Sequence, residues 1–215
     1  MRAALLAILC LACAVPPEEK PGPPREYIGE LMCRTCHTVE AEHWGDTPHA
    51  EFFRRGARTE LEARGCEACH GPGSRHLANP VDPDGLVGFT RLAGASVEQQ
   101  NGQCLECHST GGRIHWAGSA HEVQEVACSD CHNPMSRTSR RALLRGRTVH
   151  ETCFACHPAQ RLEFHKRSHM PLLEGKIECT DCHDPHGSVT DPLLRADSVN
   201  QLCTGCHADK RGPFL

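Results

Sequence analysis

The chain places short apolar stretches among long polar ones, and only the run from Ala3 to Ala12 is continuously apolar. No alternating β-branched segment extends beyond a few residues, so strands are not predicted. Apolar residues at helical spacing predict short helices at 38–45, 49–64, 94–107, 151–157 and 197–207. The remainder is rich in Gly (19) and Pro (15) and is predicted to be loop. We therefore expect a mostly irregular fold with short α-helices and little or no sheet.

Residues 1–14 are predicted to be an export signal, because Arg2 precedes an apolar run too short to be a dependable membrane span. Two cleavages stay open. Ala12-Cys13-Ala14 fits a small-x-small site, whereas Leu11-Ala12-Cys13 resembles a lipobox that would leave Cys13 lipidated. Residues 15–26 are proline-rich and are predicted to be a linker. Residues 27–215 are predicted to form the folded domain.

The five-residue pattern C-x-x-C-H occurs seven times. Its cysteines are Cys33 and Cys36, Cys66 and Cys69, Cys104 and Cys107, Cys128 and Cys131, Cys153 and Cys156, Cys179 and Cys182, and Cys203 and Cys206. Its histidines are His37, His70, His108, His132, His157, His183 and His207. The pattern attaches c-type haem, since two thiols one turn apart reach two vinyl groups and the histidine becomes the proximal iron ligand. Seven covalently bound haems c are predicted.

A single copy of the pattern has other interpretations: a redox dithiol, half of a zinc site, or a disulfide. Zinc ribbons need paired C-x-x-C units but no histidine after every second cysteine, and a disulfide has no use for that histidine. All seven copies carry it, which favours haem. Of 16 cysteines, only Cys10 and Cys13 lie outside the motifs, so the mature chain offers no structural disulfide.

Composition supports the same interpretation. Aromatic residues make up 4% of the chain, and the mean hydropathy is −0.46, so an ordinary apolar core is hard to build. The haems themselves are expected to form the core. The formal net charge is −4, and the Lys and Arg residues look scattered. They are expected to pair with haem propionates or to face solvent, and nothing indicates a nucleic-acid partner.

The motifs recur with a regular spacing in the second half of the chain. From Cys104 onward their starts are 24 to 26 residues apart, whereas the first two intervals are longer. One such period suffices for one haem, one short helix and one turn. We expect an elongated protein wrapped around a linear haem stack, in which each unit contacts mainly its neighbours.

Nine histidines lie outside the motifs, enough to give most or all of the irons a second imidazole ligand. The preferred distal ligands are His49, His76, His121, His169 and His186. The other four stay open between ligand and surface residue: His43, His115, His150 and His165.

Two segments after motifs match each other except at one position. Asp-Pro-His186-Gly-Ser follows His183, and Asn-Pro-Met135-Ser follows His132. A thioether ligand in place of imidazole would raise the potential of that haem. Packing against a haem face is the favoured alternative, so Met135 is only a weak ligand candidate.

Several longer segments carry a family resemblance over nearly the whole mature chain. They are Trp44-Gly-Asp-Thr-Pro-His49-Ala, Gly65-Cys66-Glu-Ala-Cys69-His70-Gly-Pro-Gly-Ser-Arg-His76, Trp116-Ala-Gly-Ser-Ala-His121, Ser168-His169-Met-Pro-Leu-Leu-Glu-Gly-Lys, Asp184-Pro-His186-Gly-Ser and Cys206-His207-Ala-Asp-Lys-Arg-Gly-Pro-Phe. With these segments the chain resembles the periplasmic decahaem c-type cytochromes of the MtrA/DmsE type. The resemblance implies distal ligands at the same five histidines. It also implies an elongated haem wire that carries electrons from periplasmic or inner-membrane donors toward an outer-membrane porin–cytochrome conduit.

The chain departs from that family at its C-terminus. Family members continue with another histidine and further haem motifs, whereas this chain stops at Leu215 with seven motifs. A distal ligand that normally comes from downstream is then missing or is supplied by another histidine or a partner. The departure weakens the inference that this protein spans an outer-membrane barrel.

The preferred function is electron transfer without an enzymatic reaction. The expected partners are a membrane quinol-oxidising donor and an outer-membrane or terminal cytochrome or reductase, and the expected location is periplasmic or exported, with an outer-membrane lipid anchor if Cys13 is acylated. A multihaem reductase of nitrite or hydroxylamine is an alternative, but no C-x-x-C-K variant occurs and Tyr27 is the single tyrosine. A subunit of an extracellular cytochrome filament is a third possibility.

Overall fold

A computed structural model describes residues 24–212 except 91 and 93. The α-helices of this part are α1 (Glu30–Arg34), α2 (Thr38–Gly45), α3 (Pro48–Arg54), α4 (Glu67–His70), α5 (Ser74–Ala78), α6 (Val97–His108), α7 (Ala120–Val123), α8 (Cys128–Cys131), α9 (Val149–Phe154), α10 (Pro158–Phe164), α11 (Cys179–Cys182) and α12 (Val199–Cys206). Single 3₁₀ turns form at Glu62–Arg64, Gly111–Arg113 and Ala208–Lys210. The export signal, most of the linker, Cys10 and Cys13 lie outside the described residues.

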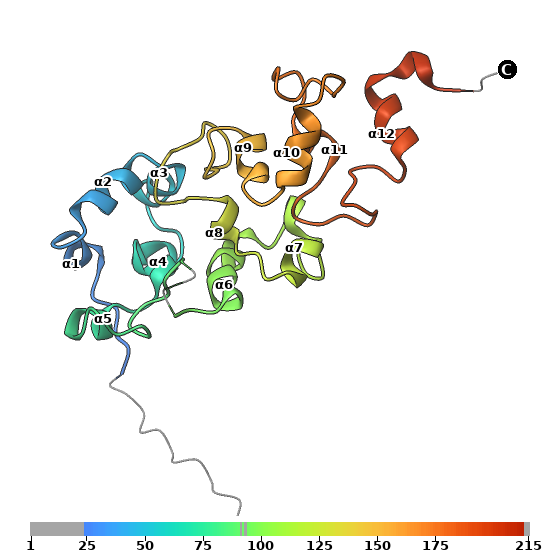
Figure 1. Cartoon of the computed structure of the whole chain (residues 1–215). Coiled ribbons are helices and arrows are strands. Elements are labelled where there is room, and N and C mark those ends of the chain that lie inside the picture. The colour runs from blue at the N-terminus through green and yellow to red at the C-terminus, as the bar shows by residue number, and fades with distance from the viewer. Residues whose placement is uncertain (1–23, 91, 93, 213–215) are drawn as a thin grey trace, which may run out of the picture.

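The molecule is elongated and follows the chain from end to end. Helices α1 to α5 lie at one end, α6 to α11 occupy the middle, and α12 lies at the other end (Figure 1). The described residues contain no strand, only isolated bridges between His132 and Leu144 and between His183 and Leu194. The expected fold class, mostly irregular with short helices, is therefore confirmed. None of the helices in this part has the length and apolar character needed to cross a membrane.

Most of the longer helices begin at a capping hydroxyl. Side-chain oxygens of Thr47, Ser96, Thr148 and Ser198 accept backbone N–H bonds at the starts of α3, α6, α9 and α12. Each cap satisfies one donor that a helix start otherwise leaves unpaired. The predictions at 38–45, 94–107, 151–157 and 197–207 each correspond to one helix, and α2 matches its prediction from end to end.

The helix predicted at 49–64 is wrong over most of its length. Helix α3 ends at Arg54, and only the single 3₁₀ turn Glu62–Arg64 follows within that range. Gly56 has a φ of 105°, in the left-handed region that ends helices and that glycine adopts without a steric penalty. Apolar residues keep their helical spacing past this glycine, but the backbone is no longer helical there.

Apolar side chains contribute little buried volume. The buried ones among the described residues are Trp44, Ala50, Ala68, Trp116, Ala127, Leu143, Val149, Leu172 and Leu194. Large side chains such as Leu31, Val81 and Val189 are at least 80% exposed. A chain of this length normally buries many more apolar side chains, so the polypeptide alone does not supply a complete core.

One buried carboxylate joins the start of the domain to α4. Glu67 is 3% exposed. Its Oε1 accepts N–H bonds from Ile28 (3.0 Å) and Gly73 (2.8 Å), and its Oε2 accepts one from Gly29 (2.8 Å). Because a buried carboxylate is stable only when its oxygens are hydrogen-bonded, these three donors fix the segment before α1 against the segment after α4.

Removing this carboxylate should destabilise the protein. The Glu67→Ala variant would leave three backbone donors without acceptors, at a cost of about 3 kcal/mol, which corresponds to a Tm lowered by roughly 6–12 °C for a chain of this size. Glu67→Gln keeps one acceptor oxygen for Ile28 and Gly73 and should lose less. Thermal unfolding followed by circular dichroism measures both, and an unchanged Tm for the alanine variant would contradict this role.

Candidate haem-binding motifs and histidine pairs

Each C-x-x-C-H motif forms one helical turn. The N–H group of the motif histidine donates to the carbonyl of the first cysteine, for example from His70 to Cys66 (3.1 Å) and from His183 to Cys179 (2.9 Å). The same bond forms at His37, His132, His157 and His207, at 2.9–3.0 Å. This turn holds two thiols and an imidazole in a fixed arrangement, as thioether attachment and axial ligation of one haem require.

Consecutive motifs lie next to each other in pairs through their first cysteines. The thiols of Cys33 and Cys66 are close enough for each to shift the pKa of the other. The same holds for Cys104 and Cys128 and for Cys153 and Cys179. In the free thiols the proximity of the last two raises the pKa of Cys153 and lowers the pKa of Cys179 to about 7.

The second cysteines join the remaining neighbours. Burial and the nearby thiol of Cys107 raise the pKa of the Cys69 thiol. Electrostatic effects of the same kind, which act over a longer range than a direct contact, relate Cys131 to Cys156 and Cys182 to Cys203 and Cys206. First cysteines are therefore near each other in motifs one and two, three and four, and five and six, and the second cysteines of motifs two, four and six are near the following motif. Motifs that are consecutive in the sequence are thus neighbours in space.

Four motif histidines face a histidine from outside the motifs. The ring centroids are 6.0 Å apart for His37 and His76, 5.9 Å for His49 and His108, 6.2 Å for His121 and His157, and 6.1 Å for His132 and His186. Two imidazoles on opposite sides of one metal ion, each at a nitrogen–metal distance of roughly 2 Å, have centroids about 6 Å apart. The four pairs therefore fit the axial ligand sets of four haem irons.

Three motif histidines and the candidate distal ligand His121 present Nε2 because Nδ1 is already bonded. Nδ1 donates to a backbone carbonyl from His70 (Val87, 2.9 Å), His121 (Pro185, 2.8 Å), His132 (Ala142, 2.6 Å) and His183 (Pro192, 2.9 Å). Such a bond fixes the tautomer whose Nε2 binds a metal. His49 differs, since its buried Nδ1 has no hydrogen-bond partner within the described ranges.

Burial also favours the uncharged form of four of the candidate ligands. Desolvation is the largest cause that lowers the pKa of His49, His70, His108 and His186. Neighbouring imidazoles lower the pKa further, as His108 does for His49 and His132 does for His186. The neutral imidazole that results is the form that coordinates iron.

The fifth preferred histidine is not paired in this way. His169 Nδ1 bonds to the Lys166 carbonyl (2.6 Å), and its Nε2 bonds to Glu174 (3.0 Å). Within the part of the chain that the structure describes, no second histidine ring pairs with His70, His183 or His207. His43 is exposed, and the His150 ring lies 5.9 Å from Phe154.

The segment that carries His186 is shaped by a glycine. Gly187 has a φ of 112°, and a Cβ there would lie 2.0 Å from the His115 carbonyl oxygen. An Asx turn precedes it, with the His186 N–H bonded to Asp184 (3.1 Å). Asn133 makes the same turn with Met135 (3.1 Å), so the two segments matched by sequence also match in structure.

No three or more His, Cys, Asp or Glu side chains converge on a candidate metal-ion site in the described residues. The geometry therefore offers thiol pairs and facing imidazoles rather than the four-ligand cluster of a structural zinc site. This donor set fits haem c, whose thioethers and axial ligands come from separate side chains around a large ring.

Comparisons with known proteins agree with this chemistry. A family described as cytochrome c-type protein NrfB-like matches residues 66–145, and one described as doubled CXXCH motif matches residues 169–212. The chain is 41% identical over 187 residues, 87% of its length, to the multihaem cytochrome MtrA of Shewanella baltica (strain OS185). This chain is a multihaem c-type cytochrome that is similar to MtrA. It spans 55% of that relative's length.

The close approach at Gly187 gives a direct test of how His186 is positioned. In the Gly187→Ala variant the new Cβ would collide with the His115 carbonyl and displace the adjacent His186. In a fraction of the molecules, one haem should therefore become high-spin. Gly102→Ala is the matched control, because nothing lies within 4 Å of its Cβ position. Low-temperature EPR of the oxidised proteins measures the effect, and identical spectra for both variants would contradict it.

Proposed function

We propose that the chain is an electron carrier that holds seven haems c in single file, in the order of their motifs. The observation that carries this proposal is the proximity of consecutive motifs: their cysteines influence one another's pKa, and α4 packs near α6, α6 near α8 and α9 near α11. Thioether attachment at these cysteines would bring each ring close to the next one along the chain. When bound, haem c supplies an iron that passes single electrons by cycling between the ferric and ferrous states.

The histidine pairs support a proposed set of ligands for four of the irons. The fourteen motif cysteines would attach the rings, and the seven motif histidines would be the proximal ligands. The proposed distal ligands are His76 opposite His37, His49 opposite His108, His121 opposite His157 and His186 opposite His132. His169 remains a proposed ligand from its sequence context, and ligation would replace its present contact with Glu174.

Paired imidazoles favour a carrier over a reductase. A substrate such as nitrite must reach an iron with an open coordination position, and two histidines close both axial positions. Rings such as His121 and His132, whose Nδ1 is hydrogen-bonded to a backbone carbonyl, would stay in place in either oxidation state, so little rearrangement would accompany electron transfer. The carrier is therefore the function that the four pairs support best.

Location and partners form part of the same proposal. The protein acts in the periplasm or is exported, since haem c is attached outside the cytoplasm. It would accept electrons from a membrane quinol-oxidising donor and deliver them to an outer-membrane or terminal redox protein. The similarity to a multihaem cytochrome named MtrA supports this class of partner.

Replacing one distal histidine tests both the ligands and the function. His186→Ala should keep its full haem content, since the thioethers remain, and should gain one high-spin ferric haem together with one additional carbon monoxide site when reduced. The exposed His43 provides the control, because His43→Ala should leave the spectrum unchanged. EPR spin quantification, compared with a haem assay, gives the number of high-spin haems per protein. Carbon monoxide titration gives the number of open sites in the reduced protein.

Two results would count against the proposal. Loss of haem from His186→Ala, or an unchanged low-spin spectrum, would show that His186 is not a simple axial ligand. Turnover of nitrite or hydroxylamine by the unmodified protein would show that it is a reductase rather than a carrier.

A further inference from the structure

Five arginines lie in one short loop between the fourth and fifth motifs. They are Arg137, Arg140, Arg141, Arg145 and Arg147, and all five are exposed. No Asp or Glu occurs from residue 131 to residue 150. We call these five side chains the arginine surface. Residues 24–136 contain nine Lys or Arg and 16 Asp or Glu, whereas residues 137–215 contain 12 and nine, so the arginine surface begins the basic part of the chain.

The backbone of this loop is held in place, which directs the arginines outward. Leu143 is 9% exposed and Ser139 is 5% exposed, so both point inward. The Ser139 hydroxyl donates to the Arg141 carbonyl (2.7 Å) and accepts the Leu144 N–H (2.7 Å). The arginines between these anchors project from a fixed loop, as a preformed binding surface requires.

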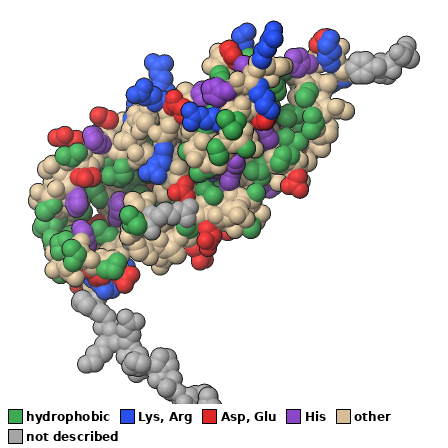
Figure 2. Space-filling view, in the orientation of Figure 1, with side chains coloured by type: hydrophobic (Ala, Val, Ile, Leu, Met, Phe, Trp, Pro, Cys, Tyr) green, Lys and Arg blue, Asp and Glu red, His purple; other side chains and the backbone are tan. Residues whose placement is uncertain are grey.

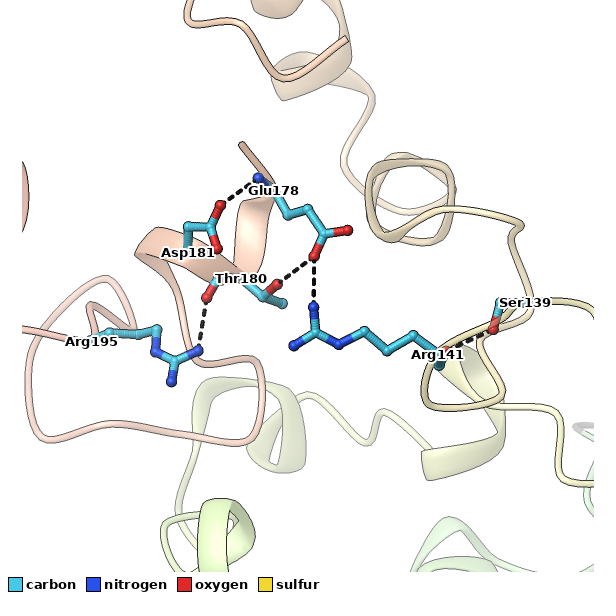
Figure 3. Close-up of polar contacts among 6 residues, drawn as sticks. All are labelled: Ser139, Arg141, Glu178, Thr180, Asp181 and Arg195. Atoms are coloured by element: carbon cyan, nitrogen blue, oxygen red, sulfur yellow. Dashed lines mark hydrogen bonds and ion pairs between the residues drawn. The ribbon is translucent and has the colours of Figure 1, made fainter. Parts of the chain in front are cut away.

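Three of the arginines are free to meet a partner. The described part of the chain offers no side-chain hydrogen bond or ion pair to Arg137, Arg140 or Arg147. Arg141 is engaged: its guanidinium donates to Glu178 (3.1 Å), which ties the loop to the start of α11 (Figure 3). Figure 2 shows Lys and Arg side chains at several separate places along the upper edge of the molecule.

The arginine surface lies directly beside the fourth motif. The Arg145 N–H donates to the Cys131 carbonyl (2.9 Å), and the Ala142 carbonyl accepts from His132 Nδ1 (2.6 Å). A protein bound at these arginines would therefore be close to the ring attached at Cys128 and Cys131. Short separation is what electron exchange between two proteins needs, whereas a lipid or nucleic-acid ligand would gain nothing from it.

We propose that the arginine surface is the docking site of an acidic redox protein, which exchanges electrons with the carrier at the fourth motif rather than at an end of the row. This inference rests on the proposed function as a carrier. Unpaired guanidinium groups on a fixed loop attract carboxylates from solution and accelerate encounter, and they can then bind them in two-pronged hydrogen bonds. The attraction should weaken as added salt screens it.

The test uses the haem-loaded protein and reduced flavodoxin, a small acidic one-electron donor, as the probe. Stopped-flow absorbance measures the rate of haem reduction at several salt concentrations, and calorimetry measures binding. The test variant replaces Arg137, Arg140 and Arg147 with glutamine. A control variant replaces Arg161, Arg167 and Arg211, which are also exposed, and so removes the same charge elsewhere.

The arginine-surface variant should react with flavodoxin roughly tenfold more slowly at low salt, bind it correspondingly more weakly, and lose most of the salt dependence. The control variant should stay within about twofold of the unmodified protein. Equal losses in both variants would overturn the proposal, because net charge alone would then explain the rate. Unchanged rates with shifted haem potentials would also overturn it, since the arginines would then pair with this protein's own propionates.

Two further readouts separate other occupants and the carrier role. The variant could leave the flavodoxin rate unchanged but abolish a salt-sensitive self-association, which would assign the surface to a second copy of the chain. Loss of binding to anionic vesicles, again with an unchanged flavodoxin rate, would assign it to a membrane. Dithionite reduces haems without docking. If dithionite reduces the haems and the flavodoxin rate is the same in the variant and the unmodified protein, the docking site alone is refuted. If the haems accept electrons from neither donor, the carrier function is refuted.

Discussion

The helical turn of each C-x-x-C-H motif is the constraint on which the rest of this structure depends. A hydrogen bond from the histidine N–H to the first-cysteine carbonyl closes the turn and fixes two thiols and an imidazole together. The cysteine neighbours and the histidine pairs described above all involve one of these groups. With few buried apolar side chains of its own, the chain depends on these turns to place the large apolar rings that complete its core.

The contacts between motifs operate over two ranges. Cysteines of sequence neighbours lie near one another, as expected for a row of repeats. The histidine pairs reach further: His49 follows the first motif and faces His108 of the third, and His186 follows the sixth and faces His132 of the fourth. Each of these pairs therefore links two units that are not adjacent in the sequence.

Much of the site could be predicted from the sequence, because the chemistry of haem attachment requires a short local pattern. Four of the five preferred distal histidines face a motif histidine in the structure. Their partners could not be predicted, since each partner is brought close by tertiary contacts rather than by spacing. The helix expected at 49–64 was wrong because one glycine, Gly56, ends it. The one-turn helices at α4, α8 and α11 are too short to show a helical period. In the sequence the Lys and Arg residues looked scattered, and only the fixed loop shows that the five arginines after His132 form one surface.

The most direct test of single-file order is a crystal structure of the haem-loaded protein with iron positions located by anomalous diffraction. The account predicts seven iron peaks in one row, each next to the irons of the preceding and following motifs, with one peak between His132 and His186. An iron whose nearest neighbour belongs to a non-adjacent motif, or a structure with His132 and His186 on different irons, would contradict it.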